Sequence, residues 1–193
     1  MMFVPESVPQ LAVNELERIL KHRKNYERVV VIALRGYYLD SMGKRGENDR
    51  GIYDDAIFVC ETDGQGHIAG AYRFNANTDP SISRKGIAVL RTGTWRYKPG
   101  IHNISKPKNR QYPAFVQDRK VTVDRDGGAS ETAYLGINIH KGGRTTTSSE
   151  GCQTIHPDQW DAFYSKVIGL LKKNGQNNFA YELMNESDRR EYV

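Results

Sequence analysis

The chain has 193 residues, of which 38% are hydrophobic and 10% aromatic, and its formal net charge is +5. This length predicts one domain, residues 1–193, and this composition excludes a disordered chain. The basic residues are scattered and form no stripe interleaved with aromatics, which argues against a nucleic-acid partner. The positive charge permits an anionic partner such as nucleic acid, a cell-wall polymer or a membrane surface, and it fits equally an ordinary solvated surface.

The sequence carries no pattern for export or for membrane insertion. No segment is long and apolar enough to span a bilayer, and residues 1–20 lack the basic region, apolar region and cleavage site of a signal peptide. We therefore expect a transmembrane-free monomer that is synthesised in the cytoplasm. Cys60 and Cys152 are expected to be free thiols, with Cys60 packed in the core.

The first half of the chain predicts a helix followed by strands. Apolar residues at helical spacing predict a helix over 5–25, within an N-terminal segment, 1–27, that packs on the rest. The Val-rich run 28–36 is typical of a buried strand. A polar, Gly-rich loop then reaches residue 55, and its charges at Arg35, Arg45, Arg50, Asp54 and Asp55 fit either a substrate groove or a solvated loop.

Short strands with turn signals between them fill most of the remaining chain. They are predicted over 56–62, 67–76, 86–97, 101–106, 114–118, 120–128, 133–143 and 178–184, with a turn at 98–100. One helix is predicted from Pro157 to Gly175, with an apolar face and basic residues before the glycine. The fold class is therefore mixed and mainly β, a sandwich or open barrel with flanking helices.

The stretch "INIHKGGRTTTSSEGCQTIHP", residues 137–157, places His140 at a strand end and Cys152 just before a helix. A cysteine nucleophile needs a lowered thiol pKa and a neighbouring base, and an imidazole supplies both. Gly151 allows close backbone approach and lets successive amides point at a developing oxyanion. The stretch therefore predicts a thiol acyl-transfer site.

A zinc site is the alternative, since Cys152 and His156 have C-x3-H spacing and His140 is near in sequence. The chain has no H-E-x-x-H helix and no second paired Cys/His motif, so we expect no metal and no cofactor. His102, after the turn at 98–100, fits equally well in a cleft wall or in solvent.

The motif "IHKGG…SSEGCQ" resembles the active-site signature of the L,D-transpeptidase (YkuD-type) catalytic domain family. "YKPGIHNI", residues 97–104, stands where the family has a Thr-Pro-x-Gly-x-Phe-like turn. The resemblance covers about residues 87–184, and the loop 35–55 is similar to that of phage-encoded lysis enzymes of this type. It implies an L,D-transpeptidase-like fold acting on peptidoglycan stem peptides.

The resemblance also implies roles for individual residues. Cys152 would attack the carbonyl of an L-centre, and His140 would form the thiolate–imidazolium pair and protonate the leaving amine. A backbone carbonyl of Lys141 or Gly142 would orient His140, and the amides of Gly151 and Cys152 would form the oxyanion hole. Ser149 would shape the loop, and the candidate substrate-binding residues are Arg144, Ser149, Gln153 and Tyr134; an arginine suits a substrate carboxylate.

Several positions depart from the family pattern. The interval from His140 to Cys152 is shorter than is usual, Glu150 replaces a His or Lys, and Gln153 and Thr154 replace an apolar residue and an Arg or Asn. A trimmed loop opens the site to water, which favours hydrolysis over amine transfer. We therefore expect a cysteine-dependent stem-peptide hydrolase, an L,D-peptidase or carboxypeptidase, that serves as a phage lysis enzyme and acts on the wall after release. The alternatives are an L,D-transpeptidase that forms cross-links and a non-catalytic cell-wall-binding phage protein.

Overall fold

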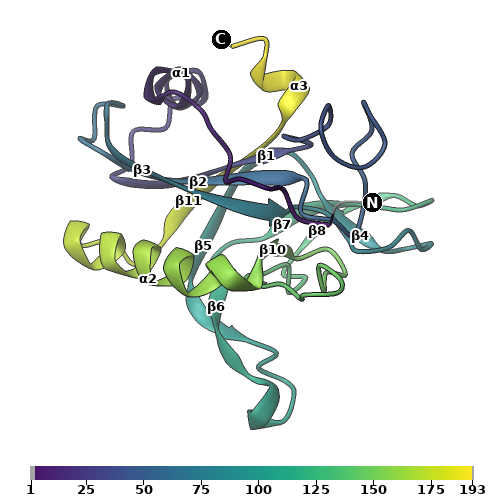
Figure 1. Ribbon diagram of the computed structural model, residues 1–193. Coiled ribbons are helices and arrows are strands. Elements are labelled where there is room, and N and C mark those ends of the chain that lie inside the picture. The colour runs from purple at the N-terminus through teal and green to yellow at the C-terminus, as the bar shows by residue number, and fades with distance from the viewer. Residues whose placement is uncertain (1–2, 193) are drawn as a thin grey trace.

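The computed structural model describes residues 3–192 (Figure 1) and is mainly β, with 35% strand and 19% helix. The predicted mainly-β fold with flanking helices is confirmed. In chain order the elements are α1 (Val13–Arg23), β1 (Val29–Arg35), β2 (Asp55–Thr62), β3 (Ile68–Asn77), β4 (Ala88–Leu90), β5 (Gly93–His102), η1 (Lys108–Arg110), β6 (Tyr112–Gln117), β7 (Val121–Arg125), β8 (Ser130–Ala133), β9 (Ile139–Lys141), β10 (Gln153–Ile155), α2 (Pro157–Asn174), β11 (Phe179–Asn185) and α3 (Glu186–Arg189).

The large sheet is a closed barrel with the strand order β1-β11-β5-β6-β9-β10-β3-β2, and β4, β7 and β8 form a small second sheet. Within residues 3–192 the barrel closes because β1 pairs in parallel with β11 and antiparallel with β2. The sandwich or open barrel expected from the sequence is thus a barrel that closes. Strands β9 and β10 are also parallel, and this pair carries the site described below.

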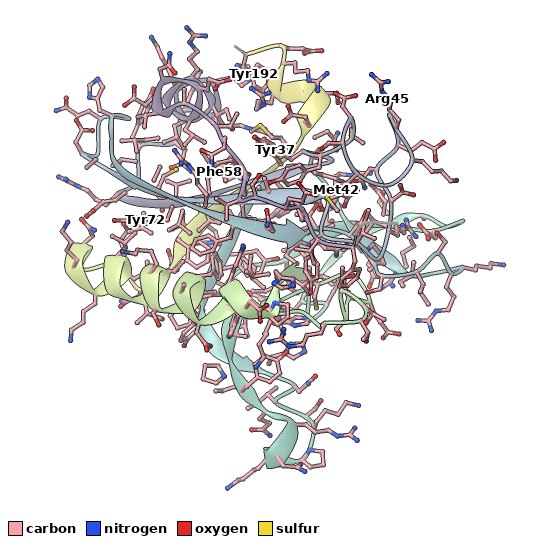
Figure 2. All side chains as sticks on the ribbon, in the orientation of Figure 1. Tyr37, Met42, Arg45, Phe58, Tyr72 and Tyr192 are labelled. Atoms are coloured by element: carbon pink, nitrogen blue, oxygen red, sulfur yellow. The ribbon has the colours of Figure 1, made fainter. Side chains whose placement is uncertain are left out.

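Strand β1 is buried on both faces, as its Val-rich run predicts. Val29, Val31 and Ala33 face the barrel core, where α2 contributes Trp160 and Phe163. The alternate residues of β1 pack with α1, on the opposite face of the sheet (Figure 1). Figure 2 shows Phe58 and Tyr37 on the α1 side and Tyr72 on the α2 side. Cys60 is fully buried on the α1 side, as expected.

Helix α1 is shorter than the helix predicted over 5–25. It begins at Val13, where the Glu15 carboxylate accepts a hydrogen bond from the Ala12 amide at 3.0 Å. Pro9 disfavours helical geometry in the residue before it, so the apolar residues upstream do not extend the helix. The helix ends at Arg23, and the capping residue Lys24 has a left-handed φ of 53°.

The predicted turn at 98–100 and separate strand at 101–106 are wrong, because β5 runs without a break to His102 and residues 103–106 are not in a strand. Pairing of β5 with β11 stops at Tyr97, and beyond it β5 pairs only with β6. Pro99 therefore removes no hydrogen bond to β11, which is how proline is tolerated in a strand. The two strands project from the barrel as a ribbon whose tip holds η1 (Figure 1).

Two predicted strands are also interrupted. The stretch 86–97 divides into β4 and β5, which belong to different sheets, and the stretch 133–143 contains only the last residue of β8 and the short β9. Gly136 has a φ of 71°, and the amides of Leu135 and Ile137 donate to the side chain of Gln117 instead of to a strand. This irregular segment, 134–138, forms one wall of the site.

Candidate active site

The pairing of β9 with β10 places His140 and Cys152 on the wall of one cavity. His140 is the register partner of Thr154, and Cys152 lies two positions before Thr154. Residues two apart along an extended chain share a face, so His140 and Cys152 point to the same side. The neighbouring partners, Ile139 and Gln153, are fully buried in the barrel. His140 and Cys152 line one cavity of about 310 Å³.

The hydrogen bonds of His140 determine which ring nitrogen is free. Its Nδ1 lies 2.8 Å from the Lys141 carbonyl oxygen and 3.0 Å from Tyr112 Oη. A carbonyl only accepts, so Nδ1 carries the proton and Nε2 is left as the acceptor for a thiol proton. The Lys141 carbonyl makes the contact that the resemblance implies for an orienting group.

Gly142 contributes to the strand pairing and packs beside Tyr53. Its amide donates to the Ile155 carbonyl at 2.9 Å, which extends the β9–β10 pairing. A Cβ at this residue would lie 2.0 Å from Tyr53 Oη, so only glycine fits beside that buried tyrosine. Tyr53 Oη in turn donates to the Gly143 carbonyl at 2.8 Å. The long loop before β2 therefore supports the strand end that carries His140.

The Cys152 sulfur lies between two backbone groups of the segment 134–138. The Asn138 amide donates to Sγ at 3.4 Å, and the thiol donates to the Gly136 carbonyl at 3.4 Å. Cys152 is partly exposed, whereas Asn138 and His140 are buried. The Asn138 amide would stabilise a thiolate, because it points at the atom on which the negative charge forms.

Burial keeps both reactive groups uncharged at rest. Burial, with a smaller contribution from the neighbouring His102, lowers the pKa of His140 to about 3, against the effect of the Lys141 carbonyl. Burial raises the pKa of the Cys152 thiol to about 11, the Asn138 amide opposes this, and Glu150 adds to it. A thiolate–imidazolium pair would therefore form only if the thiol proton moved to His140.

The loop before Cys152 is held by Ser149. Its Oγ donates to the Cys152 carbonyl at 2.7 Å and accepts from the Gly151 amide at 3.0 Å. The Gly151 amide is thus occupied, whereas the Cys152 amide has no acceptor within residues 3–192. Gly151 has a φ of 125°, and a Cβ there would lie 2.5 Å from the Ala88 carbonyl oxygen.

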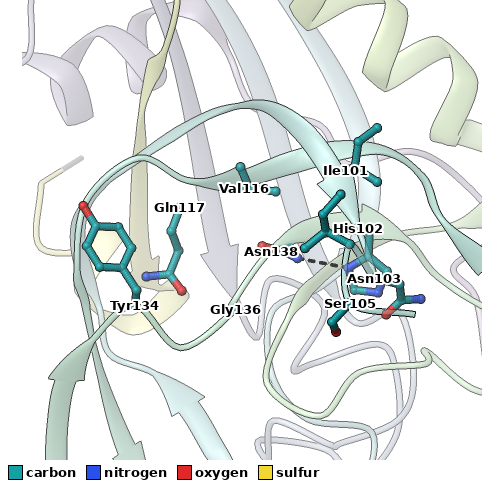
Figure 3. A pocket seen from close by; sticks show the side chains of 10 residues that line it. Ile101, His102, Asn103, Ser105, Val116, Gln117, Tyr134, Gly136 and Asn138 are labelled. Carbon is teal, nitrogen blue, oxygen red and sulfur yellow. Dashed lines mark hydrogen bonds between the residues drawn. The ribbon is translucent and has the colours of Figure 1, made fainter. Parts of the chain in front are cut away.

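The candidate substrate-binding residues lie in different places. Gln153 is fully buried and accepts from Tyr181 Oη at 3.0 Å, and Ser149 is buried in its loop, so neither lines the cavity. Arg144 is exposed and forms an ion pair with Asp158, at the start of α2. Tyr134 is 63% exposed and lies at one end of a larger groove (Figure 3).

This larger groove, of about 490 Å³, adjoins the Cys152 cavity, and both are lined by His102, Asn103 and Gly136. His102, which fitted either a cleft wall or solvent, is in the cleft wall. Its Nδ1 lies 3.0 Å from Asn138 Nδ2, the contact drawn in Figure 3. Sequence reasoning missed Tyr112 and Asn138, and only the β5–β6 pairing of Tyr112 with His102 brings the tyrosine into the site.

The residues of the zinc alternative do not converge. His156 caps the N-terminus of α2, where it accepts from the Asp158 amide, and its ring packs against Tyr53 with centroids 5.0 Å apart. Within residues 3–192 no group of three or more His, Cys, Asp or Glu side chains is arranged to hold a metal.

The loop carboxylates Asp54 and Asp55 are buried, so they form neither a groove nor a solvated surface.

Comparisons with known proteins found no matching family model, no matching curated protein and no matching solved structure. The assignment of chemistry therefore depends on the residues of the cleft. In the described part of the chain, no helix has both the length and the hydrophobicity needed to cross a bilayer.

Proposed function

We propose that this protein is a cysteine-dependent hydrolase of peptidoglycan stem peptides, with an L,D-transpeptidase-like fold. The observation that carries the proposal is the shared cavity of Cys152 and His140, in which the Lys141 carbonyl fixes the imidazole tautomer that accepts a thiol proton. The proposed setting is phage lysis: synthesis in the cytoplasm, release, and action as a monomer on the cell wall, with no nucleic-acid partner and no cofactor.

The proposed reaction proceeds through an acyl-enzyme. His140 Nε2 takes the thiol proton while Sγ attacks the carbonyl carbon of an L-centre, and the Cys152 amide donates to the oxyanion. The C–N bond then breaks as the imidazolium gives its proton to the leaving amine. Water, deprotonated by His140, attacks the thioester, and the thiol is restored when the carboxylic product leaves.

An open cleft favours water over an amine as the second reactant. The Cys152 cavity continues into the larger groove through His102, Asn103 and Gly136, so the acyl-enzyme would be accessible to solvent. Transfer to an amine requires a site that excludes water. We therefore propose hydrolysis as the main outcome and cross-link formation as the alternative.

The proposal is tested by incubating the protein with purified tetrapeptide-stem muropeptides and measuring the masses of the products. Cleaved stems or a released D-amino acid, formed with addition of one water, are expected. Cross-linked products without cleavage would contradict hydrolysis. Cys152→Ala should abolish product formation, whereas Cys60→Ala, a change at the buried cysteine on the α1 side, should retain it. Wall binding without turnover by the wild-type protein would favour the non-catalytic alternative.

A further inference from the structure

A second imidazole lies directly against the proposed catalytic base. The rings of His102 and His140 are stacked, with centroids 4.0 Å apart and planes 23° apart. His102 comes from the end of β5 and His140 from β9, which do not pair with each other in the barrel order. Both rings line the cavity that contains Cys152. The mechanism above leaves His102 without a role.

The two rings cannot both carry a charge at this separation without a large energetic cost, because like charges a few ångströms apart disfavour each other's ionisation. His140 must become an imidazolium in the first step. A proton already on His102 would therefore oppose that step. We propose that His102 is a pH-dependent switch of the Cys152–His140 pair, and that protonation of His102 turns the pair off by preventing formation of the His140 imidazolium.

Burial makes His102 the first of the two rings to take a proton as the pH falls. His140 is buried, whereas His102 is half-buried and open to the larger groove. Burial lowers the pKa of both rings, and for His140 the value falls to about 3. His102 is therefore neutral near neutral pH, and as the pH falls it takes a proton while His140 is still neutral.

The contacts of His102 fit this role. Asn138 Nδ2 donates to its Nδ1, so the neutral ring carries its proton on Nε2. The same Asn138 donates its backbone amide to the Cys152 sulfur, which couples the position of His102 to that of the nucleophile. The titratable or charged groups that face His102 or its immediate partners are His140, Tyr112, Cys152, Glu150 and Lys141.

This inference rests on the proposed pairing of Cys152 with His140, and its test does not need the substrate. The rate of Cys152 alkylation by iodoacetamide is measured against pH and located by peptide mass mapping. Cys60 does not interfere, because it is fully buried and burial raises the pKa of its thiol to about 12. In the wild type the rate of Cys152 alkylation should fall at low pH, and this acid limb of the pH profile should follow the protonation of His102.

His102→Phe retains a ring that can stack, and His102→Gln retains a neutral polar group, so the two variants are measured in parallel. In both, the acid limb should move down by about one pH unit or more, which makes alkylation at a pH within the wild-type acid limb roughly tenfold faster than in the wild type. His67→Gln is the matched control, because His67 is exposed and pairs with Asp63 in the turn after β2; its limb should match that of the wild type.

Three results would overturn the inference. An unchanged acid limb in both His102 variants would remove the switch while leaving the Cys152–His140 pair intact. A uniform loss of alkylation at all pH values, in a variant that keeps the wild-type circular dichroism and Tm, would give His102 a different role. A wild-type rate that simply follows ionisation of a thiol with a raised pKa would refute the pair itself, and with it the proposed function.

Discussion

Gly151→Ala tests whether the loop that presents Cys152 is as constrained as the structure indicates. A φ of 125° is one that residues with a side chain rarely adopt, which costs about 1–3 kcal/mol. The new Cβ would lie 2.5 Å from the Ala88 carbonyl oxygen and 3.2 Å from Ile137 Cδ1. This overpacking adds about 1–3 kcal/mol. The free energy of unfolding should therefore fall by about 2–6 kcal/mol.

The matched control is Gly127→Ala, because Gly127 has a φ of 66° and a methyl group added there would meet no atom within 4 Å. It incurs only the left-handed backbone cost, about 1–2 kcal/mol. Urea unfolding of both variants separates the backbone cost from the contact with Ala88. Alkylation of Cys152 should slow in Gly151→Ala alone. A Gly151→Ala protein that is as stable and as reactive as the Gly127→Ala protein would refute this account of the loop.

Three further changes have defined outcomes. Tyr112→Phe removes the hydroxyl 3.0 Å from His140 Nδ1, so the cleavage rate should fall by about tenfold, the equivalent of one hydrogen bond, with little change in Tm. Burial raises the pKa of Asp54 to about 9. The stability that the protonated Asp54 gives the fold is therefore fully present below the pKa of the unfolded state and is lost as the pH rises toward 9. Asp54→Asn should raise Tm at pH 8 relative to wild type, and this gain in Tm should shrink toward pH 4. Arg144→Ala breaks only an exposed ion pair with Asp158, so Tm should stay within about 2–4 °C of wild type, and a large loss of cleavage would show instead that Arg144 binds substrate.

The sequence predicts best those elements whose pattern is complete within one segment. The Val-rich run of β1 indicates a strand buried on both faces, and Pro157 and Gly175 delimit α2 as capping rules predict. The course of β5 through Pro99 depends on β11 ending its pairing at Tyr97, which no local pattern contains. Closure of the barrel depends likewise on the pairing of β1 with β11, near the other end of the chain.

The residues of the site divide in the same way, into those evident from the local sequence and those that only strand pairing brings in. Cys152 and His140 are recognisable because a short polar loop joins them in sequence, whereas Tyr112 and His102 reach them through the pairing of β5 with β6. The sequence places Gln153 at the substrate, but strand alternation points it into the barrel once Cys152 points out. That outcome was available from the sequence, since adjacent residues of a strand face opposite sides.

The central claim is that Cys152 forms a covalent acyl-enzyme with a stem peptide. The most direct measurement is rapid acid quenching of the protein with tetrapeptide muropeptides, followed by intact-mass and peptide-mapping mass spectrometry. The account predicts a thioester adduct confined to the peptide that contains Cys152, with the mass of the acyl part of the stem and formed before free product. Cleavage that proceeds in Cys152→Ala, or an adduct on any other residue, would contradict it.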